Sequence, residues 1–295
     1  MIDYIIPFVD DSDANWLKVY EQYTDDILDS GRWRDWGILR YQLRSIEKYM
    51  PWVDRIILVL SIGASQIPKW LNTDNPKIRI VYDYEFMPKE LLPTFNSNSI
   101  ELYFPRIKCL HEHYLTACDD YILMREFKEE EFFTQDGKIR LKIDNVSLQN
   151  TMYGLTVANS VRMIYPDGVK NESSNIKCLW ANHTVTPHIK SVNEEFLDKH
   201  EDEIYKSITR ERSECNLTWL IYSLNAMKLG LLNKGDVKVG VKRLRNNSDI
   251  DGLVFDDCDI AVLNDWYDGW DFDIVKPLLE KKMEALLPNK CEFEI

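Results

Sequence analysis

Short apolar runs alternate with amphipathic stretches through the first eighty residues. The apolar runs have the length and the aliphatic content of buried strands, and they are Asp3 to Val9, Arg55 to Ser61 and Ile78 to Val81. The stretches between them predict helices, at Asn15 to Ile27, Arg32 to Pro51 and, briefly, Ile67 to Leu71. This β-α-β-α-β order predicts an α/β fold built on a mostly parallel, doubly wound sheet.

The later part of the chain is less regular. We expect residues 142–163 to be helical in their later half, and the Pro, Gly and Ser content of 165–175 is typical of a loop. The further predicted elements are a helix at Ser191 to Ile208, a helix around Trp219, a strand at Ile260 to Leu263 and a final helix at Phe272 to Leu286. We expect one domain over 1–295, and an insertion or subdomain, if there is one, lies at 125–180.

One stretch, Leu92 to Met124, carries unusual polar groups between apolar ones. A run of small polar residues opens it, namely Thr94, Asn96, Ser97 and Asn98 around Phe95. Two adjacent carboxylates, Asp119 and Asp120, interrupt an apolar run near its end. Buried paired charges are costly unless a cation or a donor meets them. The pair therefore indicates either a metal or phosphate site at a strand end or a surface turn.

A second acidic group follows the first predicted strand. The residues are Asp10, Asp11, Ser12 and Asp13, directly before a predicted helix. Strand ends of this kind form ligand sites in α/β sheets. The alternative is a helix N-cap supplied by Ser12 or Asp13, and one turn can serve both purposes.

Two arginines and two histidines are further candidates. Arg40 and Arg44 lie four residues apart on one helical stripe. Like charges at this spacing repel each other, and a shared anion would reverse the effect. Ion pairs with Glu47 and other carboxylates are the alternative. His183 and His188 stand before a predicted helix, where either a catalytic or a structural role is open.

Composition and charge exclude several classes of protein. The net charge of −13 argues against non-specific nucleic-acid binding. The sequence has neither a signal peptide nor an apolar stretch of about 18–20 residues. Its six cysteines lack metal-site spacing, so we expect free thiols and a cytoplasmic protein, with peripheral membrane association left open. Glycine-rich nucleotide motifs and the GxSxG elbow are also missing.

Taken in order, these segments resemble the four motif regions of the Stealth family of sugar-phosphate transferases. The first region resembles Phe8 to Asp13, and the third resembles His183, Pro187, Lys190-Ser191 and Arg212-Ser213. The second region is the most specific. Its segments here are Arg32 to Ile46, Pro51-Trp52-Val53, Gln66 to Leu71, and the stretch that starts with Leu92 to Asn98 and ends at Asp119-Asp120. The fourth resembles Leu263-Asn264-Asp265 and Leu287-Pro288 to Phe293-Glu294. Cys118 and Pro105 depart from the family pattern, where Asn and His are usual.

The resemblance implies a nucleotide-sugar transferase (GT-A-like) sheet with a helical insertion. It also implies transfer of a sugar 1-phosphate from a nucleotide-sugar, with a UDP-sugar as first choice, to a glycan hydroxyl in capsular or cell-wall polysaccharide synthesis. A divalent cation, Mg²⁺ or Mn²⁺, would suit the oxygen ligands. The implied ligands are Asp119, Asp120, Asn264 and Asp265.

The remaining roles follow from the same resemblance. His183 is the first choice for general base, with Asp10 or Asp13 as the competing base, and Arg212 would hold the phosphates. The further substrate-binding residues would be Arg40, Arg44, Thr94, Asn96, Ser97 and Asn98. The expected partners are the donor, a glycan or sugar acceptor and, peripherally, a membrane assembly complex. Two alternatives stay open: a metal-dependent glycosyltransferase, and a non-catalytic glycan-binding assembly protein.

Overall fold

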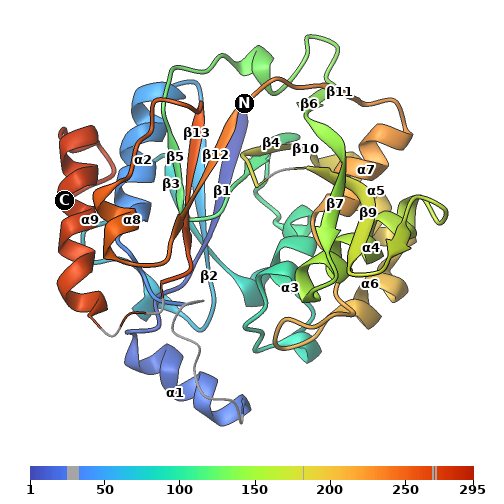
Figure 1. Ribbon diagram of the computed structural model, residues 1–295, viewed down its shortest axis with the longest axis horizontal. Coiled ribbons are helices and arrows are strands. Elements are labelled where there is room, and N and C mark those ends of the chain that lie inside the picture. Colours follow the sequence, from blue (N-terminus) through green and yellow to red (C-terminus); the bar gives the residue numbers. More distant parts are fainter. Residues whose placement is uncertain (25–32, 182, 268, 270) are drawn as a thin grey trace.

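A mixed five-stranded sheet forms the centre of the computed structural model, which describes residues 1–24, 33–181, 183–267, 269 and 271–295 (Figure 1). Its strand order is β10-β4-β1-β2-β3. The strands are β1 (Ile2–Phe8), β2 (Arg55–Leu60), β3 (Ile78–Tyr82), β4 (His113–Thr116) and β10 (Thr186–Ile189). The first four are parallel, and β10 runs antiparallel to β4. The predicted α/β class with a mostly parallel sheet is confirmed.

The connection between β3 and β4 creates a switch point in this sheet. The chain first builds β1, β2 and β3 in one direction and then returns to place β4 on the free side of β1. Ligands of open α/β sheets bind where such a reversal separates the carboxyl ends of two strands. The residues at these two ends are Asp10, after β1, and Asp119 with Asp120, after β4.

A second, three-stranded sheet extends the fold on one side of the molecule (Figure 1). Its order is β12-β13-β5, formed by β12 (Val239–Leu244), β13 (Ile260–Asp265) and β5 (Tyr121–Leu123). Helices α2 (Ile38–Tyr49), α8 (Asn247–Asp251) and α9 (Phe272–Leu286) cover this side. An apolar cluster that includes Tyr41, Leu244 and Leu279 joins these helices to the sheet.

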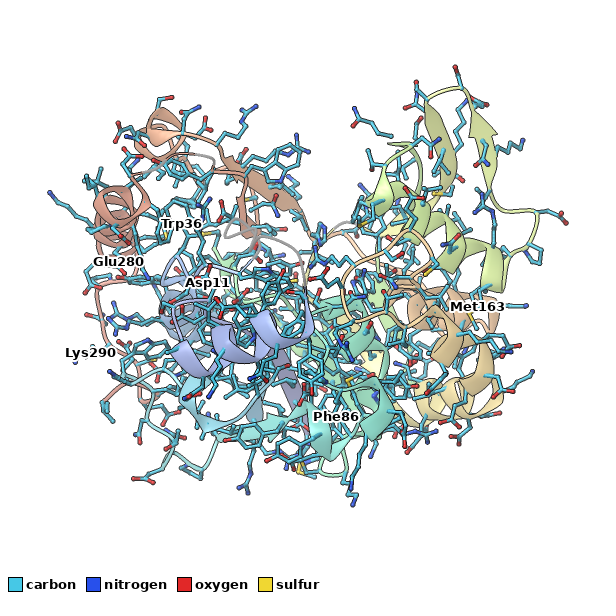
Figure 2. All side chains as sticks on the ribbon, turned by 90° about the horizontal axis from the view of Figure 1, so that it is seen from below. Asp11, Trp36, Phe86, Met163, Glu280 and Lys290 are labelled. Atoms are coloured by element: carbon cyan, nitrogen blue, oxygen red, sulfur yellow. The ribbon has the colours of Figure 1, made fainter. Side chains whose placement is uncertain are left out.

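The other side is built around an inserted antiparallel sheet, β7-β9-β8, and the helix α4. The elements of this region are β6 (Ile139–Leu141), β7 (Ile143–Gln149), α4 (Met152–Ile164), β8 (Lys170–Glu172) and β9 (Asn175–Ala181). Figure 2 shows Met163 in this region and Trp36 in the opposite one. We expected a helical insertion, but the observed one combines a helix with an antiparallel sheet. Its Val157 belongs to the same core cluster as Ile5 of β1, so the insertion and the main sheet share one core.

The remaining elements cover the sheets or connect them. The helices are α1 (Ala14–Tyr23), α3 (Ser97–Leu102), α5 (Lys190–Lys199), α6 (Glu201–Ser207) and α7 (Leu220–Lys228), and β11 (Leu232–Lys234) pairs with β6. Short 3₁₀ turns occupy Ala64–Gln66, Asp83–Glu85, Lys89–Leu91, Phe104–Arg106 and Glu129–Glu131. Within the described ranges, no helix is both long and apolar enough to cross a membrane.

Three predicted helices differ from the observed ones. The segment Ile67 to Leu71 is not a helix, because the chain turns after Pro68 and Leu71 then forms a β-bridge with Glu294. The single helix predicted at Ser191 to Ile208 breaks at His200 into α5 and α6. Helix α2 begins only at Ile38, after Gly37 with a φ of 78°, and the predicted helix end at Ile27 lies outside the described residues.

Candidate active site

Asp119 and Asp120 lie in the short connection between β4 and β5. Burial raises the pKa of Asp120 to about 7, and the charge of Asp265 raises it further. Burial, followed by Asp120 and Asp35, raises the pKa of Asp119 well above its usual range. The buried Oδ1 of Asp120 has no hydrogen-bond partner within the described chain. Such buried, like-charged oxygens favour a cation.

The acidic turn after β1 is held in place by Gln66. The amide of Asp10 donates to Gln66 Oε1 at 2.8 Å, and Gln66 Nε2 donates to the Asp10 carbonyl and to Asp13 Oδ2, both at 3.0 Å. Asp13 also accepts from the Asn15 amide at 2.8 Å as the N-cap of α1. The capping interpretation is therefore confirmed for Asp13, while Asp10 stays beside the switch point.

Asp11 is a residue of this turn to which the sequence assigned no role. Burial raises the pKa of Asp11 to about 6, and the charges of Asp10 and Asp265 contribute in the same direction, while Arg34 lowers it. The turn after β1 and the end of β13 therefore lie near each other, and Asp265 also affects Asp120. No sequence pattern indicated this, because Asp11 and Asp265 come from opposite ends of the chain. We call Asp10, Asp11, Asp119, Asp120 and Asp265 the acidic centre.

Arg34 was also missed, and it changes the interpretation of Asp265. Its Nε and Nη2 donate to the two carboxylate oxygens of Asp265 at 2.6 and 2.8 Å, and Nη2 also donates to the Tyr267 carbonyl. Both oxygens of this predicted metal ligand are thus engaged. No group of three or more His, Cys, Asp or Glu side chains is arranged to hold a metal ion within the described ranges.

A second polar group gathers around Arg212. Its Nη2 donates to Ser97 Oγ at 2.8 Å, so the guanidinium meets a neutral hydroxyl at the start of α3. Glu101 lies one helical turn after Ser97. Burial raises the pKa of Glu101 to about 7, and the charge of Arg212 lowers it. Glu101 belongs to the Leu92 to Met124 stretch, but the sequence assigned it no role.

His183 lies beside this arginine as a neutral imidazole. Burial, together with the smaller effect of the positive charge of Arg212, lowers the pKa of His183 to about 4. Tyr153 of α4 stacks on the ring, with centroids 5.8 Å apart, and its hydroxyl lies 3.3 Å from His183 Nε2. The insertion therefore supplies a side chain to the site, which the predicted helix in the later half of 142–163 did not by itself indicate.

Cys118 joins the two polar groups. Burial raises the pKa of the Cys118 thiol well above its usual range, with further increases from Asp120, Glu101 and Asp119. Cys118 directly precedes the paired carboxylates in the connection after β4, and Glu101 of α3 also affects its thiol. Gln42 of α2 fixes this position because its Nε2 donates to the Cys118 carbonyl at 2.8 Å.

The polar run at Thr94 to Asn98 supports the Arg212 loop from inside. Asn96 is fully buried, and its Nδ2 donates to the Glu211 carbonyl at 3.2 Å and to Asn216 Oδ1 at 2.9 Å. Thr94 is also buried and donates to the Arg210 carbonyl at 3.3 Å. The amide of the half-buried Asn98 donates to Asn96 Oδ1 at 3.2 Å. Of this run, Ser97 is the residue that contacts the arginine.

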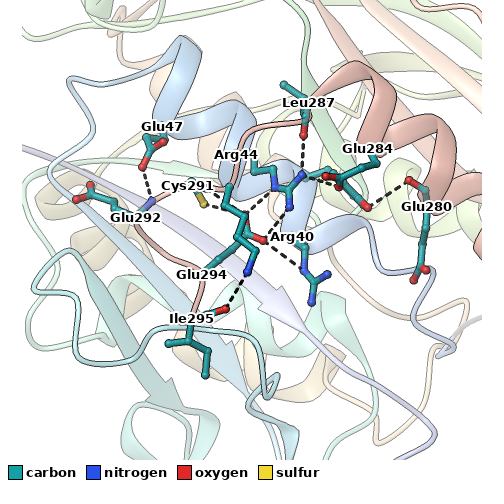
Figure 3. A network of polar contacts seen from close by, with 12 residues as sticks. Arg40, Arg44, Glu47, Glu280, Glu284, Leu287, Cys291, Glu292, Glu294 and Ile295 are labelled. Carbon is teal, nitrogen blue, oxygen red and sulfur yellow. Dashed lines mark hydrogen bonds and ion pairs between the residues drawn. The ribbon is translucent and has the colours of Figure 1, made fainter.

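Arg40 and Arg44 are engaged elsewhere, in a network at the C-terminal segment (Figure 3). Arg44 donates from Nε and Nη2 to Glu294 at 2.6 and 2.9 Å and from Nη1 to Glu284 at 2.7 Å. Arg40 lies 3.6 Å from Glu294. Both arginines thus form ion pairs with carboxylates, which was the alternative to a shared anion. Their partners are Glu294 and Glu284 instead of Glu47.

Comparison with known proteins completes the description. Residues 32–141 match the family model described as Stealth protein CR2, conserved region 2. Exopolysaccharide phosphotransferase cps2G of Lactiplantibacillus plantarum is 29% identical over 335 residues, which cover 99% of this chain and 96% of that protein. Capsular polysaccharide phosphotransferase eps5J of Streptococcus thermophilus is 32% identical over 171 residues, covering 56% of this chain and 71% of that protein. Among solved structures, the inositol-1-phosphate CTP transferase from T. maritima superimposes with a TM-score of 0.41 at 15% identity, covering 96% of each chain.

Proposed function

Because the chain belongs to the Stealth family, whose relatives named above are polysaccharide phosphotransferases, we propose that it transfers a sugar 1-phosphate from a nucleotide-sugar to a glycan hydroxyl. A UDP-sugar is the first choice of donor. The acceptor oxygen forms a bond to the phosphorus attached to the sugar, the diphosphate P–O bond breaks, and a nucleoside monophosphate leaves. The product is a phosphodiester in a capsular or extracellular polysaccharide.

The observation that carries this proposal is that Arg212, whose guanidinium donates to the neutral Ser97 hydroxyl, lies near enough to His183 to affect its imidazole, while the paired carboxylates follow β4 at the switch point of the sheet. Phosphoryl transfer needs charge neutralisation, an aligned hydroxyl and removal of its proton. The Arg212 guanidinium meets only a neutral hydroxyl in its described hydrogen bond, which leaves its charge for a phosphate.

We assign the proton transfer to His183. A neutral imidazole has an acceptor nitrogen, and the Tyr153 ring and hydroxyl orient it. Its pKa of about 4 applies without substrate. A bound phosphate would raise that pKa toward neutrality, because a nearby negative charge favours the imidazolium. Asp10 is the competing base, and Asp13 is less suited since it caps α1.

A divalent cation fits part of the acidic centre. The unpaired Asp120 oxygen and the raised pKa values of Asp119 and Asp120 support these two as ligands. Asn264 is a further candidate, because the amide of the preceding Leu263 donates to the Asp120 carbonyl. Asp265 fits less well, because Arg34 holds both of its oxygens. Bound Mg²⁺ or Mn²⁺ would neutralise the donor diphosphate.

We propose a cytoplasmic location for this reaction. The support is that all six cysteines are free thiols, as expected of a protein in a reducing compartment. Peripheral contact with a membrane assembly complex is part of the same proposal, but none of the described contacts specifies the surface involved.

The test is a screen of nucleotide-sugar donors with phosphorus NMR of the glycan product. We expect UMP release, with the sugar-linked phosphorus retained in the glycan as a phosphodiester. Release of UDP, with no phosphorus in the glycan, would instead identify a metal-dependent glycosyltransferase. An absence of turnover with every donor would favour the non-catalytic alternative.

A further inference from the structure

One face of the β12–β13 pair changes from buried to exposed as it approaches the acidic centre. Val239 pairs with Ile260, Val241 with Val262 and Arg243 with Asn264, and side-by-side residues of parallel strands point to the same face. Ile260 and Val262 are buried in the core beneath the main sheet. Val241, which pairs with Val262 from the edge strand β12, is exposed, and so is Arg243 two residues further along the same face.

Trp266 is placed at the end of this face. It lies two residues after Asn264, and its amide continues the ladder by donating to the Leu244 carbonyl at 2.8 Å. The alternation of a strand therefore puts Trp266 on the same face as Asn264, and Asp265 on the other. Trp266 is 57% exposed, although a large aromatic side chain gains by burial.

Arg243 gives this tryptophan a polar neighbour. The guanidinium carbon lies 4.8 Å from the Trp266 ring centroid, a cation–π distance. Arg243 is part of β12, and Trp266 directly follows β13, where its amide hydrogen bond to the Leu244 carbonyl positions it beside β12. We call the set Val241, Arg243, Asn264 and Trp266 the β12–β13 platform.

We propose that the β12–β13 platform binds a sugar ring of the acceptor glycan next to the residue that is phosphorylated. This inference rests on the proposed function and extends it to the acceptor. The apolar C–H face of a pyranose packs on an indole, while Arg243 and Asn264 offer hydrogen-bond donors to the hydroxyls. The platform begins beside the paired carboxylates, because the amide of Leu263, the residue before Asn264, donates to the Asp120 carbonyl at 2.9 Å.

The openness of the platform favours the acceptor over the donor. Small ligands such as nucleotides are usually enclosed, with most of their surface buried. A polysaccharide acceptor must instead run out of the site into solvent, which an exposed sheet face permits. The indole and a flanking arginine form a small mixed surface, unlike the large apolar area of a protein interface.

The decisive experiment compares Trp266→Ala with a matched exposed aromatic, Tyr205→Ala on α6, where Tyr205 is 42% exposed. Saturation-transfer NMR with the methyl glycosides of glucose, galactose, N-acetylglucosamine and N-acetylgalactosamine measures sugar binding directly. We expect the wild type and Tyr205→Ala to bind at least one glycoside. We expect Trp266→Ala to lose most of that signal and Trp266→Phe to recover part of it.

A kinetic readout separates the two reactants. With the donor and acceptor found by the screen, Trp266→Ala should raise the KM for the acceptor at least tenfold and leave the KM for the donor unchanged. A rise in the donor KM alone would place the nucleotide on Trp266 and overturn the inference, as would an unchanged acceptor KM or no glycoside binding by the wild type. If the wild type forms no phosphodiester while Trp266-dependent glycoside binding persists, the proposed function fails and the sugar platform stands.

Discussion

Replacing Arg44 is the sharpest test of how the C-terminal segment is held. The Arg44 and Glu294 side chains are only 4% and 2% exposed and meet through two hydrogen bonds. Arg44 also donates to the Leu287 carbonyl at 2.6 Å. Arg44→Ala therefore leaves the Glu294 carboxylate buried beside Arg40, which lies 3.6 Å away, and the Cys291 amide.

The expected cost follows from that burial. Breaking a buried ion pair by removing one partner costs about 3–5 kcal/mol, because the remaining buried charge is poorly compensated, here by a partly exposed Arg40 without a hydrogen bond to it. An exposed pair costs far less, about 0–1 kcal/mol. Arg245 and Asp249 provide the matched control, since they pair at 3.5 Å on the surface with Arg245 61% exposed. We expect Arg44→Ala to lower the free energy of unfolding by about 3–5 kcal/mol and Arg245→Ala by less than about 1 kcal/mol.

Urea denaturation of the single and double variants measures these values. Arg44→Met combined with Glu294→Leu should restore much of the loss, because replacing both charges removes the desolvation penalty. A loss below about 1 kcal/mol for Arg44→Ala would refute the reasoning. The same variants test a functional role: if Arg44→Lys raises the KM for the donor at unchanged stability, Arg44 binds donor phosphate after all.

The other predictions concern the site and its supports. Arg212→Ala should lower kcat by about 10³-fold or more with little change in Tm, measured by donor turnover and thermal unfolding; a large drop in Tm would indicate a structural role instead. Mg²⁺ or Mn²⁺ should raise the Tm of the wild type but not of Asp120→Asn, and equal shifts in both would contradict the assigned ligands. His188 is buried, which lowers its pKa from 6.5 to about 3. The unfolded chain therefore takes up the proton first, so this group costs stability at about 1.4 kcal/mol per unit as the pH falls from 6.5 toward 3. His188→Gln should show a shallower loss in urea titrations between pH 7 and pH 4, and an identical slope would argue against the buried neutral ring.

Sequence patterns predicted the parts of this fold that depend on nearby residues. The apolar runs of β1, β2 and β3 and the helix at Phe272–Leu286 were located within a residue or two, since periodicity is a local property. The same reasoning predicted that Asp119 and Asp120 interrupt an apolar run, and the structure divides that run into β4 and β5 on either side of them. The family resemblance was likewise carried by ordered motifs, and it is confirmed by the match over residues 32–141.

Local patterns gave no indication of which distant groups would meet. Arg34 binds a carboxylate 231 positions away, and Arg44 binds one 250 positions away. Tyr153 reaches His183 because the insertion shares a core with the main sheet. Residue type and spacing thus determined the strands and the candidate charges. Packing alone decided which charges are neutralised inside the protein and which remain for a ligand, because each buried charge needs whatever partner the fold brings near it.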